Sequence, residues 1–137
     1  MDLATSRYQA ADLIEASGRT AVGITRGYPR FKLRYPVVAN LRQLAPTREM
    51  IRVDDADVFE EMYRNRLEDL GVGGVRELLT MCAERANNER LAMLCYEDLT
   101  KPGQRCHRRL FATWWQESTG EVVPELEPDI RQEQLFG

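Results

Sequence analysis

The chain has 137 residues, 43% of them hydrophobic and 30% charged, with a formal net charge of −3 at neutral pH. This length is enough for one domain with a buried core and too short for two. Charged residues interrupt every apolar stretch, so we expect neither a membrane span nor a signal peptide, and the predicted location is the cytoplasm. Three cysteines without a disulfide-type spacing favour free thiols in a reducing compartment.

The first third of the chain is predicted to contain three short strands and a helix. Residues 2–6 and 20–26 are small and β-branched, which is typical of buried strands, and 35–41 is a third candidate. Residues 8–18 predict a short helix that Gly18 ends. Each strand is followed by polar or basic residues.

The middle of the chain predicts two consecutive helices. Asp54 or Asp55 provides the N-cap of the first, and Gly71 ends it, with the GVGG stretch up to Gly74 as the turn between helices. The second, within 75–86, repeats apolar residues at helical spacing and places Cys82 in the core as a packing residue. The buried stripe of the first helix is expected at Val58, Met62, Tyr63, Leu67 and Leu70.

A continuous apolar run at 91–97 predicts an internal strand, and residues 106–120 predict a helix ending at Gly120. Strands alternating with helices indicate an α/β fold, a single-domain Rossmann-like sandwich with a small, largely parallel sheet flanked by helices. We assign residues 1–127 to this domain. Residues 128–137 are expected to be an acidic, flexible tail.

Positive charge is concentrated between residues 19 and 52, where eight basic residues face one acid. Arginine presents a planar fork of donors that matches the oxygens of a phosphate. The stretch therefore predicts a phosphate-binding surface. The competing interpretation is a solvated surface in a chain whose basic residues are nearly all arginine.

Chemically capable residues gather around the late strand and the helix that follows it. Cys95 and Glu97 stand at the end of the strand, where α/β proteins bind ligands. Cys106 stands at the start of the next helix, whose free amides and dipole attract anions and favour a thiolate. These residues and His107 are the candidate catalytic groups. The candidate ligand-binding residues are Ser6, Arg7, Arg26, Arg108 and Arg109.

Every one of these residues also has a structural alternative. Cys95 suits a core position, Glu97 suits a cap or an ion pair, and His107 suits a polar cap. Arg108 and Arg109 point in different directions on a helix, so at least one is expected in solvent. Neighbouring Cys106 and His107 are poorly placed for joint ligation or for a Cys-His pair, unless the cysteine precedes the first helical turn.

No metal site and no cofactor are predicted. Zinc is disfavoured because the chain lacks a CxxC knuckle, although the cysteines, the histidine and Glu97 are all legitimate ligands. A Walker A loop, a glycine-rich dinucleotide fingerprint and a nucleophile elbow are absent from the sequence.

The pattern Cys95-x-Glu97, a short loop, and then Cys106-His107-Arg108 resembles the domain-of-unknown-function family numbered 488 (DUF488). Residues 21–31 are similar to that family's second strand, which ends in an arginine followed by a proline, and residues 3–8 to its first strand. The resemblance implies a Rossmann-like fold with these residues around one pocket, and it implies no reaction. Many members have a histidine in the first-strand motif, where this chain has Ser6 and Arg7.

Three functions follow from these observations. The first is a thiol- or acid–base-dependent enzyme acting on a phosphorylated or nucleobase-like small molecule, with Arg26 and Arg108 holding the anion. The second is a non-catalytic module that binds a nucleotide or a nucleic-acid phosphate. The third is a protein-interaction domain. The expected partner is a small anionic ligand, with nucleic acid as the alternative and no membrane.

Overall fold

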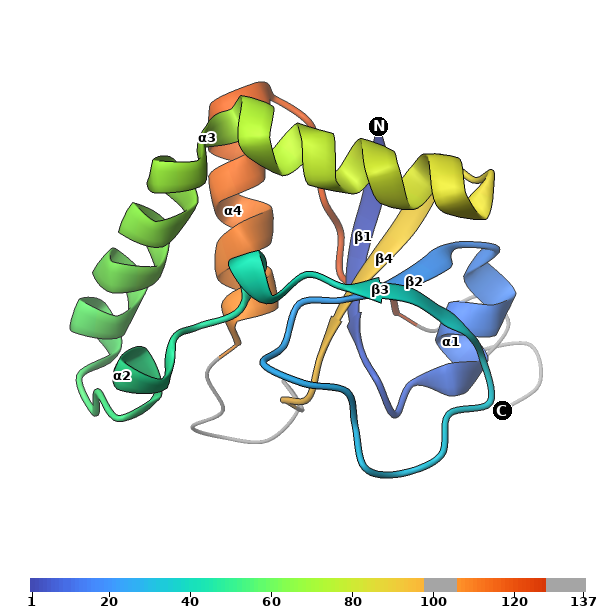
Figure 1. Cartoon of the computed structure of the whole chain (residues 1–137), viewed down its shortest axis with the longest axis horizontal. Coiled ribbons are helices and arrows are strands. Elements are labelled where there is room, and N and C mark those ends of the chain that lie inside the picture. The colour runs from blue at the N-terminus through green and yellow to red at the C-terminus, as the bar shows by residue number, and fades with distance from the viewer. Residues whose placement is uncertain (98–105, 128–137) are drawn as a thin grey trace.

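A four-stranded sheet forms the centre of the computed structural model, which describes residues 1–97 and 106–127 (Figure 1). Its strands are β1 (Asp2–Arg7), β2 (Thr20–Gly23), β3 (Val37–Asn40) and β4 (Arg90–Cys95). The order is β1-β4-β2-β3, and every pair is parallel. The predicted Rossmann-like α/β fold is thereby confirmed.

Helices and loops cover both faces of the sheet. In β4, Leu91 and Met93 point into a core shared with α3 (Ala56–Ala86) and α4 (His107–Thr119). Ala92 and Leu94 point the other way, into a smaller core with α1 (Ala11–Ser17). A strand buried on both faces must be apolar at every position, which explains the unbroken apolar run in β4.

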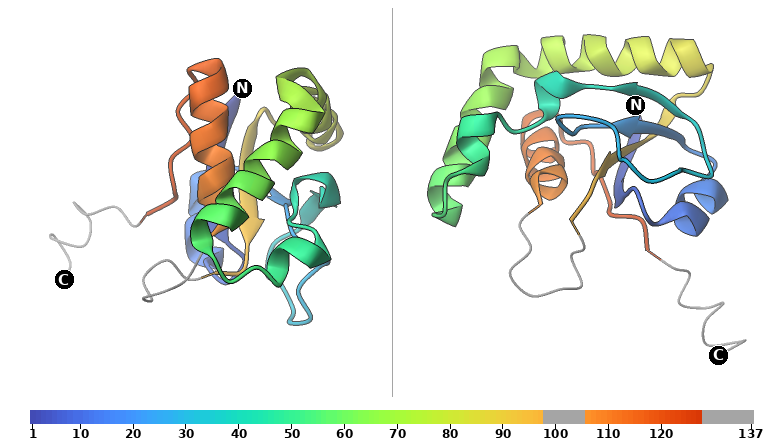
Figure 2. Two further views of the ribbon diagram at one scale, coloured as in Figure 1. Left: turned by 90° about the vertical axis from the view of Figure 1, so that its left-hand side faces the viewer. Right: turned by 60° about the horizontal axis from the view of Figure 1, so that its bottom comes forward.

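The long α3 consists of two helical segments that meet at a glycine. Asp55 caps its start by accepting hydrogen bonds from two backbone amides, as the sequence predicts. Gly71 has φ 72° and ψ 163°, which interrupts the helix at that single residue, and the ribbon changes direction there (Figures 1 and 2). The predicted four-residue turn is therefore wrong, because Gly73 and Gly74 already belong to the second segment.

One position of the predicted buried stripe on α3 is also wrong. Val58 is 44% exposed, and Phe59 is buried in its place. The remaining members of the stripe are buried or pack against the core. Phe59 stacks on Tyr63 one turn further along, with ring centroids 6.5 Å apart, so the buried face at the start of α3 begins at Phe59, near the short helix α2 (Arg48–Ile51). Cys82 lies in the core as predicted.

Two further segments shape the carboxyl end of the sheet. β2 ends at Gly23, earlier than the predicted strand, and the chain turns away while Ile24 N still donates to Leu94 O. Before α2, a short 3-10 helix, η1 (Arg42–Leu44), lies beside this turn. Near the C-terminus, Glu125 forms an isolated bridge with Thr5, which adds an extended segment outside β1.

None of the described helices is long and apolar enough to cross a membrane. The predicted flexible tail at 128–137 lies outside the described residues.

Candidate functional site

Two cysteine thiols meet at the carboxyl end of the sheet. Cys95 is the last residue of β4, and Cys106 is the N-cap of α4, with an extended backbone at φ −135° and ψ 111°. Their Sγ atoms lie 3.1 Å apart, and both residues are buried. The end of β4 and the start of α4 therefore lie side by side.

Arg108 connects these thiols to the C-terminal segment. Its Nη1 donates to Cys95 Sγ at 2.9 Å and to the backbone oxygen of Glu97 at 2.8 Å. Its Nε and Nη2 donate to the carboxylate of Glu125. Arg108 is 1% exposed. Its donors are occupied by the protein, so its charge acts on the thiols and the guanidinium is not open to a ligand.

The charges around the two thiols drive their pKa values apart. Burial of Cys106 opposes ionisation, but the hydrogen bond with Cys95, the charge of Arg108 and the Arg109 amide outweigh it and lower the pKa of Cys106. Burial, together with the bond to Cys106, raises the pKa of Cys95 strongly. Cys106 is therefore the more readily ionised of the two thiols, and Cys95 is the one that keeps its proton.

Glu97 completes a cluster with the two sulfur atoms. One carboxylate oxygen of Glu97 and the Sγ atoms of Cys95 and Cys106 lie within 4.8 Å of one another. Glu97 Oε2 is buried and accepts no hydrogen bond within the described part of the chain. Two thiolates and a carboxylate are suitable ligands for zinc. The prediction of no metal stays a prediction, since folding brings together donors that the sequence spacing keeps apart.

The imidazole of His107 is bound to the backbone just after β2. Its Nε2 lies 2.5 Å from the backbone oxygen of Ile24, and because a carbonyl only accepts, Nε2 carries the proton. The ring also meets Tyr63 edge-on, with centroids 5.6 Å apart. Burial lowers the pKa of His107, so the ring is neutral near pH 7. His107 therefore lines the site in a fixed orientation, and its Nε2 is not a base for Cys106.

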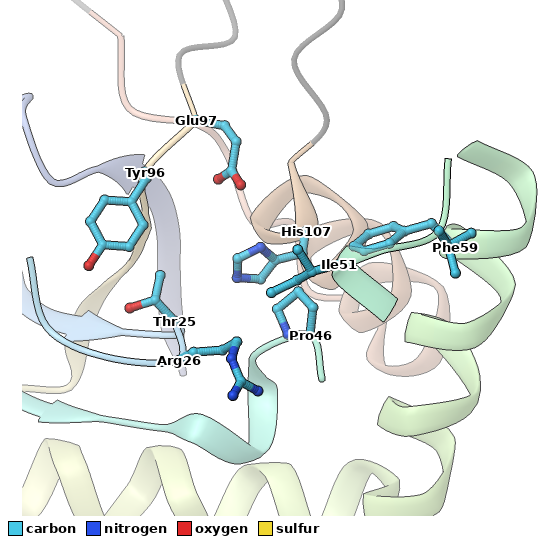
Figure 3. A pocket seen from close by; sticks show the side chains of 9 residues that line it. Thr25, Arg26, Pro46, Ile51, Phe59, Tyr96, Glu97 and His107 are labelled. Carbon is cyan, nitrogen blue, oxygen red and sulfur yellow. The ribbon is translucent and has the colours of Figure 1, made fainter. Parts of the chain in front are cut away.

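A hollow of about 310 Å³ opens beside the cluster (Figure 3). Glu97 and His107 line one side, with the Glu97 carboxylate turned toward the imidazole, and Arg26 lies on the opposite side. The remaining walls are mostly apolar and come from the loop after β2, the segment around α2, the start of α3 and the end of β4: Thr25, Pro46, Ile51, Val53, Phe59 and Tyr96.

The other predicted ligand residues lie elsewhere. Ser6, Arg7 and Arg109 line a second hollow of about 1020 Å³ at the β1 side, which includes Arg108 and shares no residue with the first hollow. Arg109 Nη1 donates to Thr5 Oγ1 and Val123 O. The family-based expectation of one common pocket is therefore not met.

The expectation that Arg108 or Arg109 faces solvent is also wrong. Arg108 is buried and Arg109 is half-buried, because the segment Val123–Glu125 returns along the base of α4 and accepts their hydrogen bonds. Glu125 is the functional neighbour that the sequence did not reveal. Its position in an acidic stretch with many similar residues gives no signal of this role.

Fold and site together define a class: a Rossmann-like α/β protein with two neighbouring thiols beside an arginine at the carboxyl end of a parallel sheet. Comparisons with family models, with curated proteins and with solved structures return no match for this chain.

Proposed function

We propose that the protein is a thiol-dependent enzyme acting on a small anionic molecule, with Cys106 as the nucleophile and Glu97 as the acid–base group. The observation that carries this proposal is the 3.1 Å separation of the Cys95 and Cys106 sulfurs next to the Arg108 guanidinium. A neighbouring thiol and a cation stabilise a thiolate, which is the reactive form of cysteine.

The proposed step is a group transfer through a covalent intermediate. The thiolate of Cys106 forms a C–S bond with an electrophilic carbon of the substrate as the bond to the leaving group breaks. Glu97 supplies the proton that the leaving group takes, and it recovers a proton from the acceptor, such as water, that later cleaves the C–S bond. Glu97 suits this task because its carboxylate is close to both sulfurs and also lines the hollow.

The hollow favours a substrate with both a flat apolar part and a negative group. Apolar and aromatic side chains such as Ile51 and Phe59 contribute to its walls, and Arg26 contributes positive charge. A phosphorylated or nucleobase-like compound combines these properties. The free thiols that this chemistry needs are maintained in a reducing compartment such as the cytoplasm.

Burial of the thiols supports a second candidate, a non-catalytic binding module. Cys95 is fully buried and Cys106 is only 7% exposed. A module of this kind holds a nucleotide or a nucleic-acid phosphate through Arg26 and uses the thiols only for packing. The two candidates differ in the reactivity that they demand of Cys106.

Alkylation with iodoacetamide at neutral pH, followed by peptide mass spectrometry, tests the proposal. Cys106 is expected to react faster than Cys82 and Cys95, because its thiolate fraction is larger. Cys82→Ser is the matched control, since Cys82 lies in the core away from the cluster. Equal and slow alkylation of all three cysteines would contradict the enzyme and favour the binding module.

A second measurement addresses turnover directly. A panel of nucleoside monophosphates, whose glycosidic carbon is electrophilic and bears a nucleobase as leaving group, is incubated with wild-type protein and with Cys106→Ser. If Cys106 is the nucleophile, the Cys106→Ser variant loses all turnover and keeps its affinity for the substrate. A variant that keeps its activity would exclude Cys106 from the chemistry.

A further inference from the structure

Within the basic stretch between residues 19 and 52, folding gives some arginines a carboxylate partner and places others around a hollow. Arg19 pairs with Asp2, and Arg34 pairs with Asp12 and Glu15. Arg26 and Arg42 instead line a shallow hollow of about 520 Å³. Arg34 also lines a hollow, but Asp12 lines it too, whereas no acidic residue lines the hollow of Arg26 and Arg42.

A third arginine reaches this hollow from a distant part of the sequence. Arg66 of α3 joins Arg26, from the loop after β2, and Arg42 of η1. The other lining residues are neutral: Asn40, Gln43, Pro46 and Thr47. Three guanidinium groups thus surround one hollow that has no acidic side chain in its walls.

These three arginines have no carboxylate partner among residues 1–97 and 106–127. Such uncompensated positive charge in a concavity is costly to assemble, and it raises the local concentration of anions. The arrangement is therefore better suited to holding a ligand than to stabilising the fold.

Arg66 is fixed in place by the backbone. Its Nε donates to Ala45 O at 2.7 Å and its Nη2 to Arg42 O at 3.0 Å. The guanidinium is consequently oriented before any ligand arrives, and its Nη1 donates to no described group. A preorganised donor binds an anion with a smaller loss of side-chain entropy.

The basic hollow adjoins the hollow lined by Glu97 and His107. Arg26 and Pro46 line both of them. An anionic group between Arg26, Arg42 and Arg66 can therefore belong to a molecule whose apolar part lies against Ile51 and Phe59.

We propose that the hollow lined by Arg26, Arg42 and Arg66 is a phosphate subsite, and that it binds the phosphate of a monoester whose apolar or aromatic body occupies the adjoining hollow. That the apolar or aromatic part of this monoester is the part that reacts rests on the proposed function. The phosphate subsite itself does not rest on it. A bidentate arginine contact suits a phosphate better than a single lysine charge would. The chain's net charge of −3 and pI near 5.3 favour a small phosphate over a nucleic acid, which selects basic surfaces.

Isothermal titration calorimetry with inorganic phosphate and with phenyl phosphate tests the subsite on the full chain. Phenyl phosphate is expected to bind more tightly, because only it also fills the apolar hollow. Arg42→Gln is expected to weaken both by about tenfold, the worth of one charged hydrogen-bonded contact. This variant keeps the backbone oxygen that Arg66 uses, so the fold is retained, and Arg66→Gln provides an independent second variant.

The paired variants Arg48→Gln and Arg52→Gln are matched controls, since both arginines are exposed next to the hollow and line neither cavity. They are expected to bind phenyl phosphate like wild type. Equal weakening by the controls, or no weakening by Arg42→Gln and Arg66→Gln, would overturn the proposal. Binding of a DNA oligonucleotide with steep salt dependence and no binding of phenyl phosphate would also overturn it, in favour of a nucleic-acid surface.

The outcomes for the subsite and for the enzyme are separable. Cys106→Ser is expected to bind phosphate normally, and Arg42→Gln is expected to leave ligand-free alkylation of Cys106 unchanged. Absence of phosphate binding by the wild-type protein, together with a reactive Cys106, overturns only the subsite. An unreactive Cys106 with intact phosphate binding contradicts only the enzyme.

Discussion

Cys95 and Cys106 are 11 residues apart in the chain, and their sulfur atoms lie 3.1 Å apart. The strand end fixes one and the helix start fixes the other, so neither sulfur depends on a long flexible side chain for its position. Two thiols held at this separation need a movement of about 1 Å to reach a disulfide bond length. They are therefore a dithiol pair whose chemistry can be measured without knowledge of a substrate.

Oxidation with diamide is expected to link Cys95 to Cys106 and to spare Cys82. The Cys106 thiolate attacks the oxidant first, and Cys95 is the sulfur within reach to complete the bond. Non-reducing peptide mapping checks the linkage, and dithiothreitol is expected to reverse it. Cys82→Ser should behave like wild type, while Cys95→Ser should leave Cys106 as a mixed adduct. A disulfide that includes Cys82 would disprove the pairing.

The pH profile of Cys106 alkylation is expected to respond in opposite directions to two substitutions. Arg108→Gln removes the positive charge beside the thiols, which raises the pKa of Cys106 and moves the profile to higher pH. Glu125→Gln removes the negative partner of Arg108 and moves the profile to lower pH. Circular dichroism verifies that each variant is folded. Identical profiles for all three proteins would show that Arg108 does not activate the thiolate.

His107 is expected to make the protein less stable in mild acid. Because burial lowers the pKa of His107 below the value of 6.5 that it has when unfolded, the unfolded state binds more protons in this range. Its stabilising contribution is present above about pH 6.5 and decreases as the pH falls below that value. Urea unfolding between about pH 7 and 5.5 measures the slope, and His107→Gln is expected to flatten it.

Nitrogen-15 NMR of the single histidine provides the companion measurement. A neutral ring with the proton on Nε2 is expected at pH 6.5, as the bond to Ile24 O requires. A ring that is already protonated at that pH would contradict the stability prediction.

Two glycines in α3 are expected to respond with opposite signs to alanine. Gly71 has φ 72° and ψ 163°, a conformation that is almost restricted to glycine, so Gly71→Ala costs about 1–3 kcal/mol of unfolding free energy. Gly73 is inside the second helical segment with open space where an added Cβ would lie, so Gly73→Ala stabilises by about 0.5–1 kcal/mol. Thermal or urea unfolding compares the two. Equal effects would show that α3 does not need its break.

Local sequence patterns determined the strands and the longer helices of this protein and several of their ends, although β2 ends earlier than predicted and η1 and α2 were not predicted. The apolar run of β4, the cap at Asp55 and the stop glycines at positions 18 and 120 act within a few residues of one another. The α/β class follows from their order along the chain. The proximity of Cys95 to Cys106 was also predictable, because a strand end and the following helix start share one edge of a parallel sheet.

Only the tertiary structure decided which charges act together. Glu125 reaches Arg108 because the C-terminal segment pairs outside β1, and Arg66 joins Arg26 and Arg42 because α3 packs beside η1. Such contacts depend on the paths of segments far apart in sequence, and exposed charged residues carry no periodicity that would reveal their partners. For the same reason the sequence identified Arg108 as a basic residue of the site but not its partners. In the folded protein its guanidinium donates to the Cys95 thiol and to the Glu125 carboxylate.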